Sequence, residues 1–350
     1  MYLTIILILL IFFSILEVRK NKTCGSRMFY VFILTFYLLS FLRWERGTDW
    51  PSYYELYESP FLYGDGSFEL PYYGLNILFG TILGLDYTWF LLFQATIIYF
   101  YLYKSIQLNC KYWVVALFCS YIILGNGGIF FVRQTIAMCI IFYAYRYIPQ
   151  KDYKKFFLQI LFAACFHSAS LIALPLIYIY DLKINRRFMY VLALSVFATI
   201  FLYKYGLLER FESKLGSYRE EGNMQDNVMQ FYYGIVNKLV FLAIFTLYHK
   251  KDQEECGLQK IFIYSLFLYV FFGSMNITLS RLSNFVAMFQ VYQIVKIIER
   301  QRLRATKRYA FLVIIIVIMG LRTLFSISPY KNLMVPYKSI FNKELKVEVY

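Results

Sequence analysis

Apolar stretches of about 15 to 25 residues recur along almost the whole chain, and each is long enough to cross a bilayer as a helix. Because 60% of the 350 residues are hydrophobic and only 16% are charged, the composition excludes an ordinary soluble domain. The sequence therefore predicts an all-α fold, a polytopic transmembrane helical bundle of roughly 10–12 membrane segments. We expect residues 1–350 to form a single integral membrane domain.

Charged residues in the connecting segments orient the chain in the membrane. The first apolar run, residues 3–16, is followed and not preceded by basic residues, so we expect an uncleaved helix with its N-terminus outside. Segments 43–70 and 204–230, which carry many acidic residues, are expected outside together with the C-terminal tail 326–350. These assignments predict a multi-pass protein of the cell (plasma or inner) membrane with both termini outside.

Two apolar segments can either cross the membrane or re-enter it. Residues 71–85 are short and interrupted by three glycines, which favours an interfacial or re-entrant segment. Residues 156–180 either cross or form a broken hairpin with His167 near its turn, and Pro175 is compatible with a break, so we favour the hairpin. The Asn-Gly-Gly sequence at 126–128 predicts a tight external turn.

The basic excess and the cysteines limit the possible chemistry. A net charge of +15 would indicate nucleic acid in a soluble protein, but here Lys and Arg fall mostly in inter-helix loops and serve orientation, so we expect no nucleic-acid partner. The six cysteines lie in predicted helices or cytoplasmic loops and imply no disulfide framework. Neither they nor the carboxylates show metal-ligand spacing, and we expect no metal and no cofactor.

Polar side chains from distant parts of the sequence gather, on this topology, at or just under the outer face: Arg43, Arg46, Asp49, Arg133, Gln134 and Arg281. A guanidinium group stays charged and donates two parallel hydrogen bonds, which suits phosphate. A lipid-linked diphosphate in the outer leaflet is therefore the expected ligand of the arginines and Gln134. His167 lies inside an apolar segment and is the candidate general base for a sugar hydroxyl, with Asp49 as the alternative base or a sugar-orienting group.

Each of these residues also has a simpler interpretation. Arg43 and Arg46 directly follow a predicted helix and can mark the membrane interface, and Asp49 suits a turn. Arg133 and Arg281 can anchor their helices, and the histidine can be a hydrogen-bonded residue of the bundle core. Taken together, the polar residues and the loops favour a binding site.

Five short motifs follow one another along most of the chain. They are Arg43-x-x-x-Gly47-Thr48-Asp49-x-x-x-Tyr53, Glu69-Leu70-Pro71-Tyr72-Tyr73 with Leu75-Asn76, Phe131-Val132-Arg133-Gln134-x-x-Ala137, Phe166-His167-Ser168-Ala169-Ser170-Leu171, and Arg281-Leu282-Ser283. Through them the chain resembles the EpsG-like branch of the Wzy-type polysaccharide polymerases, a family that looks related to the GT-C membrane glycosyltransferases. Trp50 and Leu282 stand where Tyr and Ile are common, a modest departure from the family pattern.

The resemblance implies extracytoplasmic glycosyl transfer in exopolysaccharide, capsule or O-antigen synthesis. A growing glycan leaves its undecaprenyl diphosphate carrier and joins the sugar of an incoming lipid-linked repeat unit. In that reaction Arg133 and Arg281 would hold the diphosphate leaving group, and His167 would activate the acceptor hydroxyl. The implied partners are undecaprenyl diphosphate-linked oligosaccharides, membrane lipids, and flippase and chain-length regulator proteins.

Two other functions compete with this interpretation. A flippase or transporter for lipid-linked oligosaccharide would also need cationic groups in the membrane, but it should show two related halves around a cavity, and the sequence shows no such repeat. A membrane O-acyltransferase or ligase would also use a histidine, although it explains the outer arginines less naturally.

The topology makes a prediction that can be measured on intact cells. In a Cys-free background, cysteines introduced at Ser67, Ser217 and Ser339 should react with an impermeant thiol reagent, because charge bias places all three outside. A cysteine at Gln301, in the basic run expected inside, should react only after permeabilisation. Protection of the Ser217 position would overturn the orientation of the middle of the chain.

Overall fold

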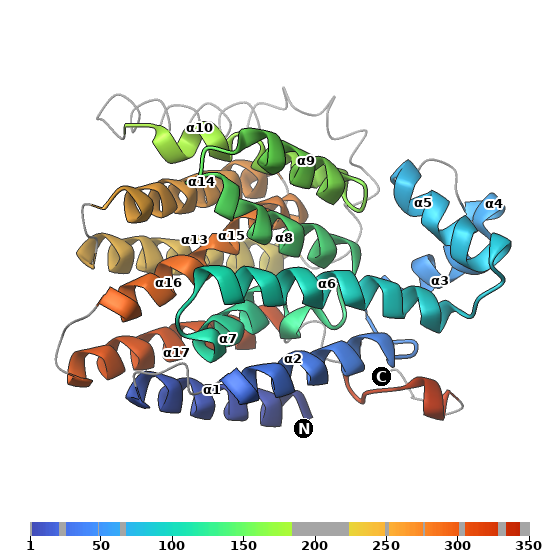
Figure 1. The fold of residues 1–350 in the computed structure, drawn as a ribbon, viewed down its shortest axis with the longest axis horizontal. Coiled ribbons are helices and arrows are strands. Elements are labelled where there is room, and N and C mark those ends of the chain that lie inside the picture. The colour runs from blue at the N-terminus through green and yellow to red at the C-terminus, as the bar shows by residue number, and fades with distance from the viewer. Residues whose placement is uncertain are drawn as a thin grey trace. The chain divides into compact units, whose positions relative to one another are not determined.

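The computed structural model describes residues 2–20, 26–47, 49–63, 68–183, 224–248, 252–275, 277–300, 305–327 and 334–343. Every regular element in these ranges is a helix, which confirms the all-α prediction for the described part of the chain (Figure 1). The chain divides into two compact units. Unit 1 comprises Met1–Leu171 and Ile294–Tyr350, and unit 2 comprises Ile172–Gln293.

Three helices in the described residues are long and apolar enough to cross a membrane, judged by length and composition. They are α1 (Tyr2–Lys20), α13 (Met224–Leu247) and α14 (Gln253–Met275), with candidate spans at Tyr2–Arg19, Met229–Leu247 and Gln253–Gly273. Shorter apolar stretches lie in α2 (Ser26–Phe41), α7 (Trp113–Ile123) and α17 (Ala305–Ile327). These helices support a membrane protein.

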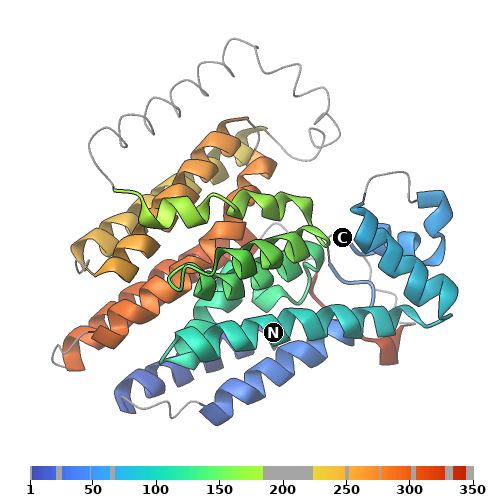
Figure 2. The same cartoon turned by 45° about the horizontal axis from the view of Figure 1, so that its top comes forward.

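In unit 1 the helix α6 (Tyr87–Asn109) packs against both α2 and α8 (Arg133–Ala144), and α8 packs against α9 (Tyr153–Ala164) (Figure 2). The helix begins where the Asp86 carboxylate accepts the Thr88 N–H at 2.8 Å, an N-cap that satisfies one of the unpaired donors of the first turn. Buried side chains recur along α6 at four-residue spacing: Phe90, Gln94, Ile98, Leu102 and Ile106.

Segments that the charge rule places on one side of the membrane meet in unit 1. The Tyr2 hydroxyl donates to Met334 O at 3.0 Å, and the Trp44 N–H donates to Lys338 O at 2.8 Å, so the N-terminus, the loop after α2 and the C-terminal tail lie together. Lys338 also pairs with Glu45. This grouping agrees with the predicted topology, and the side of the membrane that it faces stays a prediction.

The segments predicted on the opposite side of the membrane from the termini meet through two carboxylates, those of buried Glu17 and half-buried Glu299. Glu17, near the end of α1, is 1% exposed and accepts the N–H groups of Trp113, Val114 and Val115 at 2.9 to 3.1 Å. Those are first-turn donors of α7, which has no side-chain N-cap of its own. Just before α7, the Lys111 N–H donates to Glu299 Oε1 at 2.6 Å, and Glu299 lies in α16 (Phe289–Arg300). Glu17 therefore fixes α7 to α1.

The two segments whose crossing was left open are both irregular. Residues 71–85 fall on α5 (Leu70–Asn76) and the six-residue π-helix η1 (Ile77–Ile82), whose combined rise of about 20 Å is shorter than the roughly 30 Å hydrocarbon core, which fits the non-crossing interpretation. Residues 156–180 are interrupted after α9, continue as the 3-10 helix η4 (Ser168–Ala173), and form α10 (Leu176–Asp181) only after Pro175. The helix is therefore broken at His167, as the hairpin interpretation requires.

The turn at 126–128 forms, but it is buried and not at the surface. It is the 3-10 helix η2 (Asn126–Gly128), and Asn126 is 3% exposed. The reason is that α7 has only 11 residues and rises about 16 Å, so the chain turns inside the helical bundle. The Tyr99 hydroxyl, on α6, donates to Gly127 O at 3.2 Å and holds the turn in place. Arg133 thus follows a buried turn.

The described part of unit 2 is organised by α14, which packs against α10, α13 and the 3-10 helix η6 (Ile277–Ser283). Half-buried Lys238, at the middle of the α13 span, donates to Ser265 Oγ on α14 at 2.9 Å, and Ser265 Oγ donates to Ser283 O at 3.3 Å. The sequence also predicts a helix over the apolar residues 188–203, but these residues and most of the loop 204–230 lie outside the described residues. The end of that loop is helical, because α13 begins at Met224.

Candidate functional site

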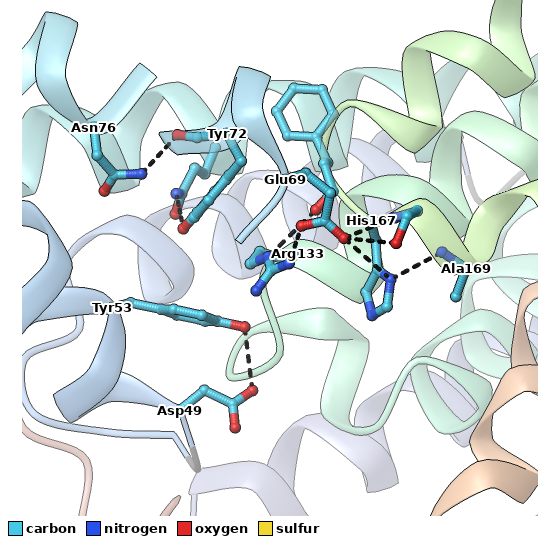
Figure 3. Close-up of polar contacts among 11 residues, drawn as sticks. Asp49, Tyr53, Glu69, Tyr72, Asn76, Arg133, His167 and Ala169 are labelled. Carbon is cyan, nitrogen blue, oxygen red and sulfur yellow. Dashed lines mark hydrogen bonds and ion pairs between the residues drawn. The ribbon is translucent and has the colours of Figure 1, made fainter. Parts of the chain in front are cut away.

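Three segments far apart in the sequence bring charged and polar side chains together in unit 1. Glu69 lies immediately before α5, Arg133 is the first residue of α8, and His167 lies in the bend between α9 and η4 (Figure 3). Ser168, the first residue of η4, is the fourth member. We call these four residues the Glu69 cluster.

Arg133 is held by one ion pair and one backbone carbonyl. Its Nη2 atom pairs with Glu69 Oε2, and its Nε–H donates to Phe166 O at 3.3 Å. Its side chain is 13% exposed. A positive charge at the N-terminus of a helix is disfavoured by the helix dipole, and α8 has no side-chain N-cap, so an anion is needed at this position. In this structure Glu69 supplies that anion.

Three aromatic rings surround the Arg133 guanidinium. Its central carbon lies 4.9 Å from the ring centre of Phe68, 5.1 Å from that of Tyr72 and 5.8 Å from that of Tyr53, distances at which a cation is attracted to the ring face. Tyr72 is fully buried and its hydroxyl accepts a hydrogen bond from Gln94 Nε2 at 3.1 Å. The rings fix the plane of the guanidinium.

Glu69 joins the arginine to the His167 bend. Its Oε1 atom accepts hydrogen bonds from the N–H of Ser168 at 2.8 Å and from Ser168 Oγ at 3.1 Å, and it lies 3.9 Å from His167 Nδ1. Burial alone would raise the pKa of the Glu69 carboxyl, but the Ser168 amide and the Arg133 charge outweigh burial and lower it. Glu69 is therefore ionised at neutral pH.

His167 is neutral in this arrangement. Burial lowers the pKa of its imidazole below the usual value and the Arg133 charge lowers it further, while the Glu69 and Asp49 carboxylates act in the opposite direction. The backbone N–H of Ala169 donates to Nδ1 at 3.4 Å. A neutral imidazole whose side chain is 31% exposed can accept or donate a proton.

Asp49 approaches the same cluster from the loop before α3 (Trp50–Glu58). It stands at the N-cap position of α3 but makes no capping hydrogen bond with its side chain. Instead its Oδ2 atom accepts a hydrogen bond from the Tyr53 hydroxyl at 3.4 Å, and Tyr53 is one of the rings around Arg133 (Figure 3). Asp49 is exposed to solvent. Of the residues predicted from the sequence, Asp49, Arg133 and His167 thus come together.

A comparison with protein families relates the chain to known proteins. The family model described as the EpsG family matches residues 26–339. The chain belongs to the EpsG family. No curated protein and no solved structure matches the chain.

The other residues predicted for this EpsG-family site differ in their burial and contacts. Arg43 is 2% exposed, donates from Nη1 to Ile129 O at 2.7 Å and lies over the Trp50 ring, and Arg46 is 5% exposed with Nε and Nη2 buried without a hydrogen-bond partner. Gln134 is half-buried next to Arg133 on α8, and Arg281 is exposed on η6 of unit 2. Within the described ranges, no three His, Cys, Asp or Glu side chains gather as metal ligands would.

Sequence reasoning missed Glu69 as a site residue. It was noted only as the first residue of a motif shared with the EpsG family, because an acidic residue in a loop expected outside carries no signal of its own. A usable signal existed, since a charged arginine at the start of an apolar helix requires a counter-ion. Of the two nearest rings around Arg133, Tyr72 enters the sequence analysis only as a motif position, and Phe68 does not enter it.

The loop that carries Asp49 depends on Gly47. Its φ of +116° is a backbone conformation that residues with a side chain rarely adopt, and a Cβ at this position would lie 2.7 Å from Phe130 O. Gly47→Ala should therefore lower the free energy of unfolding in detergent by about 1–3 kcal/mol and reduce polymer formation. Gly74→Ala on α5, where a Cβ meets nothing within 4 Å, is the matched control and should leave both unchanged. Wild-type stability of Gly47→Ala would show that the loop shifts freely.

Proposed function

We propose that this EpsG-family protein is a polysaccharide polymerase that transfers a glycan from an undecaprenyl diphosphate carrier onto a lipid-linked repeat unit outside the cell membrane. The observation that carries the proposal is the Arg133 guanidinium, held at a helix N-terminus among three aromatic rings and adjacent to a neutral histidine. Family membership supports a polymerase-type role in polysaccharide synthesis.

The chemistry follows from charge development in the transition state. As the bond between the anomeric carbon and the diphosphate oxygen breaks, the electron pair and the negative charge move onto the diphosphate. Arg133 stabilises that charge most strongly if it is already oriented, and the rings and Phe166 O orient it. The acceptor hydroxyl forms the new bond to the anomeric carbon, and its proton passes to His167.

The remaining predicted residues have supporting roles in the proposal. Asp49 is the alternative base or orients a sugar through its carboxylate, and Gln134 adds a neutral donor next to Arg133. Arg43 and Arg46 carry positive charge on the loop before Asp49, and Arg281, on η6, remains a predicted ligand of the diphosphate. The substrates are membrane lipids that carry oligosaccharide on undecaprenyl diphosphate, and flippase and chain-length regulator proteins are the expected functional partners. The proposal includes a helical bundle that is arranged as in the GT-C membrane glycosyltransferases.

Arg133→Lys tests the role of the guanidinium. Lysine keeps the charge but loses the planar fork, which removes one charge-assisted hydrogen bond of about 1.5–3 kcal/mol and slows polymerisation about tenfold to a hundredfold. The measurement is the chain-length distribution of the glycan together with the level of the protein in the membrane, in cells that contain only the variant.

The matched control is Arg146→Lys. Arg146 also stacks on two rings, at 5.5 Å from Tyr143 and 5.4 Å from Tyr147, but it lies just beyond the opposite end of α8. The Arg146→Lys variant should leave polymer length and yield unchanged. If Arg133→Lys also makes polymer of normal length and yield, Arg133 only anchors its helix and the proposed diphosphate site is wrong.

A further inference from the structure

Glu69 lies between the two groups that the proposed reaction uses. One carboxylate oxygen pairs with Arg133, and the other is held by Ser168 and lies 3.9 Å from His167 Nδ1. A carboxylate in contact with the arginine occupies the position that a phosphate oxygen of the substrate would take. In this structure the Glu69 carboxylate therefore takes the place of that phosphate oxygen.

The Arg133–Glu69 pair can be opened by a stronger anion. Neither partner is sealed from solvent, since their side chains are 13% and 14% exposed. Nη1 of Arg133 has no hydrogen-bond partner among the described residues, so the guanidinium keeps donors for a ligand. A diphosphate carries more charge than one carboxylate and can accept two parallel hydrogen bonds from the fork. A diphosphate can therefore compete with Glu69 for the guanidinium.

With Glu69 paired to Arg133, His167 is held in a form that is not a base at Nε2. Nδ1 accepts the Ala169 N–H at 3.4 Å, and a nitrogen that accepts a hydrogen bond cannot also carry the ring proton. The proton of the neutral imidazole then lies on Nε2, on the side of the ring away from Glu69. That nitrogen can take up a proton only after the ring proton moves to Nδ1.

We propose that Glu69 is a displaceable counter-ion: the carrier diphosphate takes Arg133, and the released carboxylate hydrogen-bonds His167 Nδ1 and converts Nε2 into the base. This inference rests on the proposed function and deepens it. Oε1 needs to approach Nδ1 by only about 1 Å to form a normal hydrogen bond, while Ser168 keeps it in place. Acceptor activation is thereby coupled to the presence of the donor.

The proton balance is complete without another reactant. The ring exchanges its proton from Nε2 to Nδ1 through solvent, which reaches the 31% exposed side chain. Nδ1–H then donates to Glu69, and Nε2 takes the proton of the acceptor hydroxyl as that oxygen bonds to the anomeric carbon. The imidazolium is stabilised by the Glu69 carboxylate, and the diphosphate leaves with the electron pair. Glu69 is thus a positioning residue that acts through His167.

Binding of inorganic pyrophosphate to the purified full-length protein in detergent tests the first half of the proposal. Glu69→Gln removes the competing anion and should bind pyrophosphate about tenfold more tightly than the wild type. Glu55→Gln, an exposed carboxylate on α3, changes the net charge equally and should leave the affinity unchanged. Equal or weaker binding by Glu69→Gln would overturn the counter-ion role.

Turnover and its pH dependence test the second half. Glu69→Gln should lower kcat about a hundredfold without raising KM for the lipid-linked donor, because Nε2 of His167 becomes a poorly oriented and weaker base while the diphosphate site is kept. Among the described residues, Arg133, Glu69 and Asp49 are the charged groups that act on His167, and loss of the Glu69 charge lowers the imidazole pKa. Activity falls as pH drops through that pKa, so the acid limb of kcat should move to lower pH in the variant. An unmoved limb, or wild-type kcat, contradicts the proposal.

Two further variants separate failure of this inference from failure of the proposed function. Glu69→Asp keeps the charge on a shorter side chain, so it should bind pyrophosphate as the wild type does and still lose kcat, even if the Gln variant folds poorly. Arg133→Ala should abolish pyrophosphate binding. If it does not, the diphosphate site itself is wrong, whereas if it does and Glu69→Gln binds no better than wild type, only the displaceable counter-ion is wrong.

Discussion

The ion pair between Arg133 and Glu69 is the interaction on which the site depends. Arg133 opens an apolar helix, and a guanidinium group there is unfavourable both in a low-dielectric setting and against the helix dipole. Glu69 compensates the charge from a segment 64 residues earlier in the chain, and Ser168 holds Glu69 from the bend after α9. One charge requirement therefore gathers three of the five motif segments through which the chain resembles the EpsG-like polymerases.

The position of that arginine is a consequence of how the chain turns before it. The helix α7 is too short to cross the membrane, so the Asn126–Gly128 turn is buried against α6. The residues after the turn are fixed by the loop after α2, because Arg43 donates to Ile129 O and Gly47 lies against Phe130 O. Arg43 and Gly47, both in the motif after α2, thus also set where α8 begins. The contacts of Arg43 explain why its side chain is buried.

The sequence predicted the elements well where hydrophobic length alone decides them. The apolar runs 28–42, 112–124 and 309–325 predict helices, and α2, α7 and α17 lie there; the break at His167 and Pro175 was also expected. It could not predict that the turn at 126–128 is buried, because the depth of a turn depends on helix packing and not on local sequence. It could not predict Glu69 either, since the partner of a charge is set by tertiary contacts among residues far apart in the chain.

The account is tested most directly by reconstitution of the purified protein in liposomes with the lipid-linked repeat unit that accumulates in cells lacking it. Undecaprenyl diphosphate release and glycan chain length are then measured together. The account predicts one undecaprenyl diphosphate released for each new glycosidic bond, with the glycan growing on a lipid carrier. Movement of the lipid-linked repeat across the bilayer, without a new bond or any release of undecaprenyl diphosphate, would contradict it and indicate a transporter.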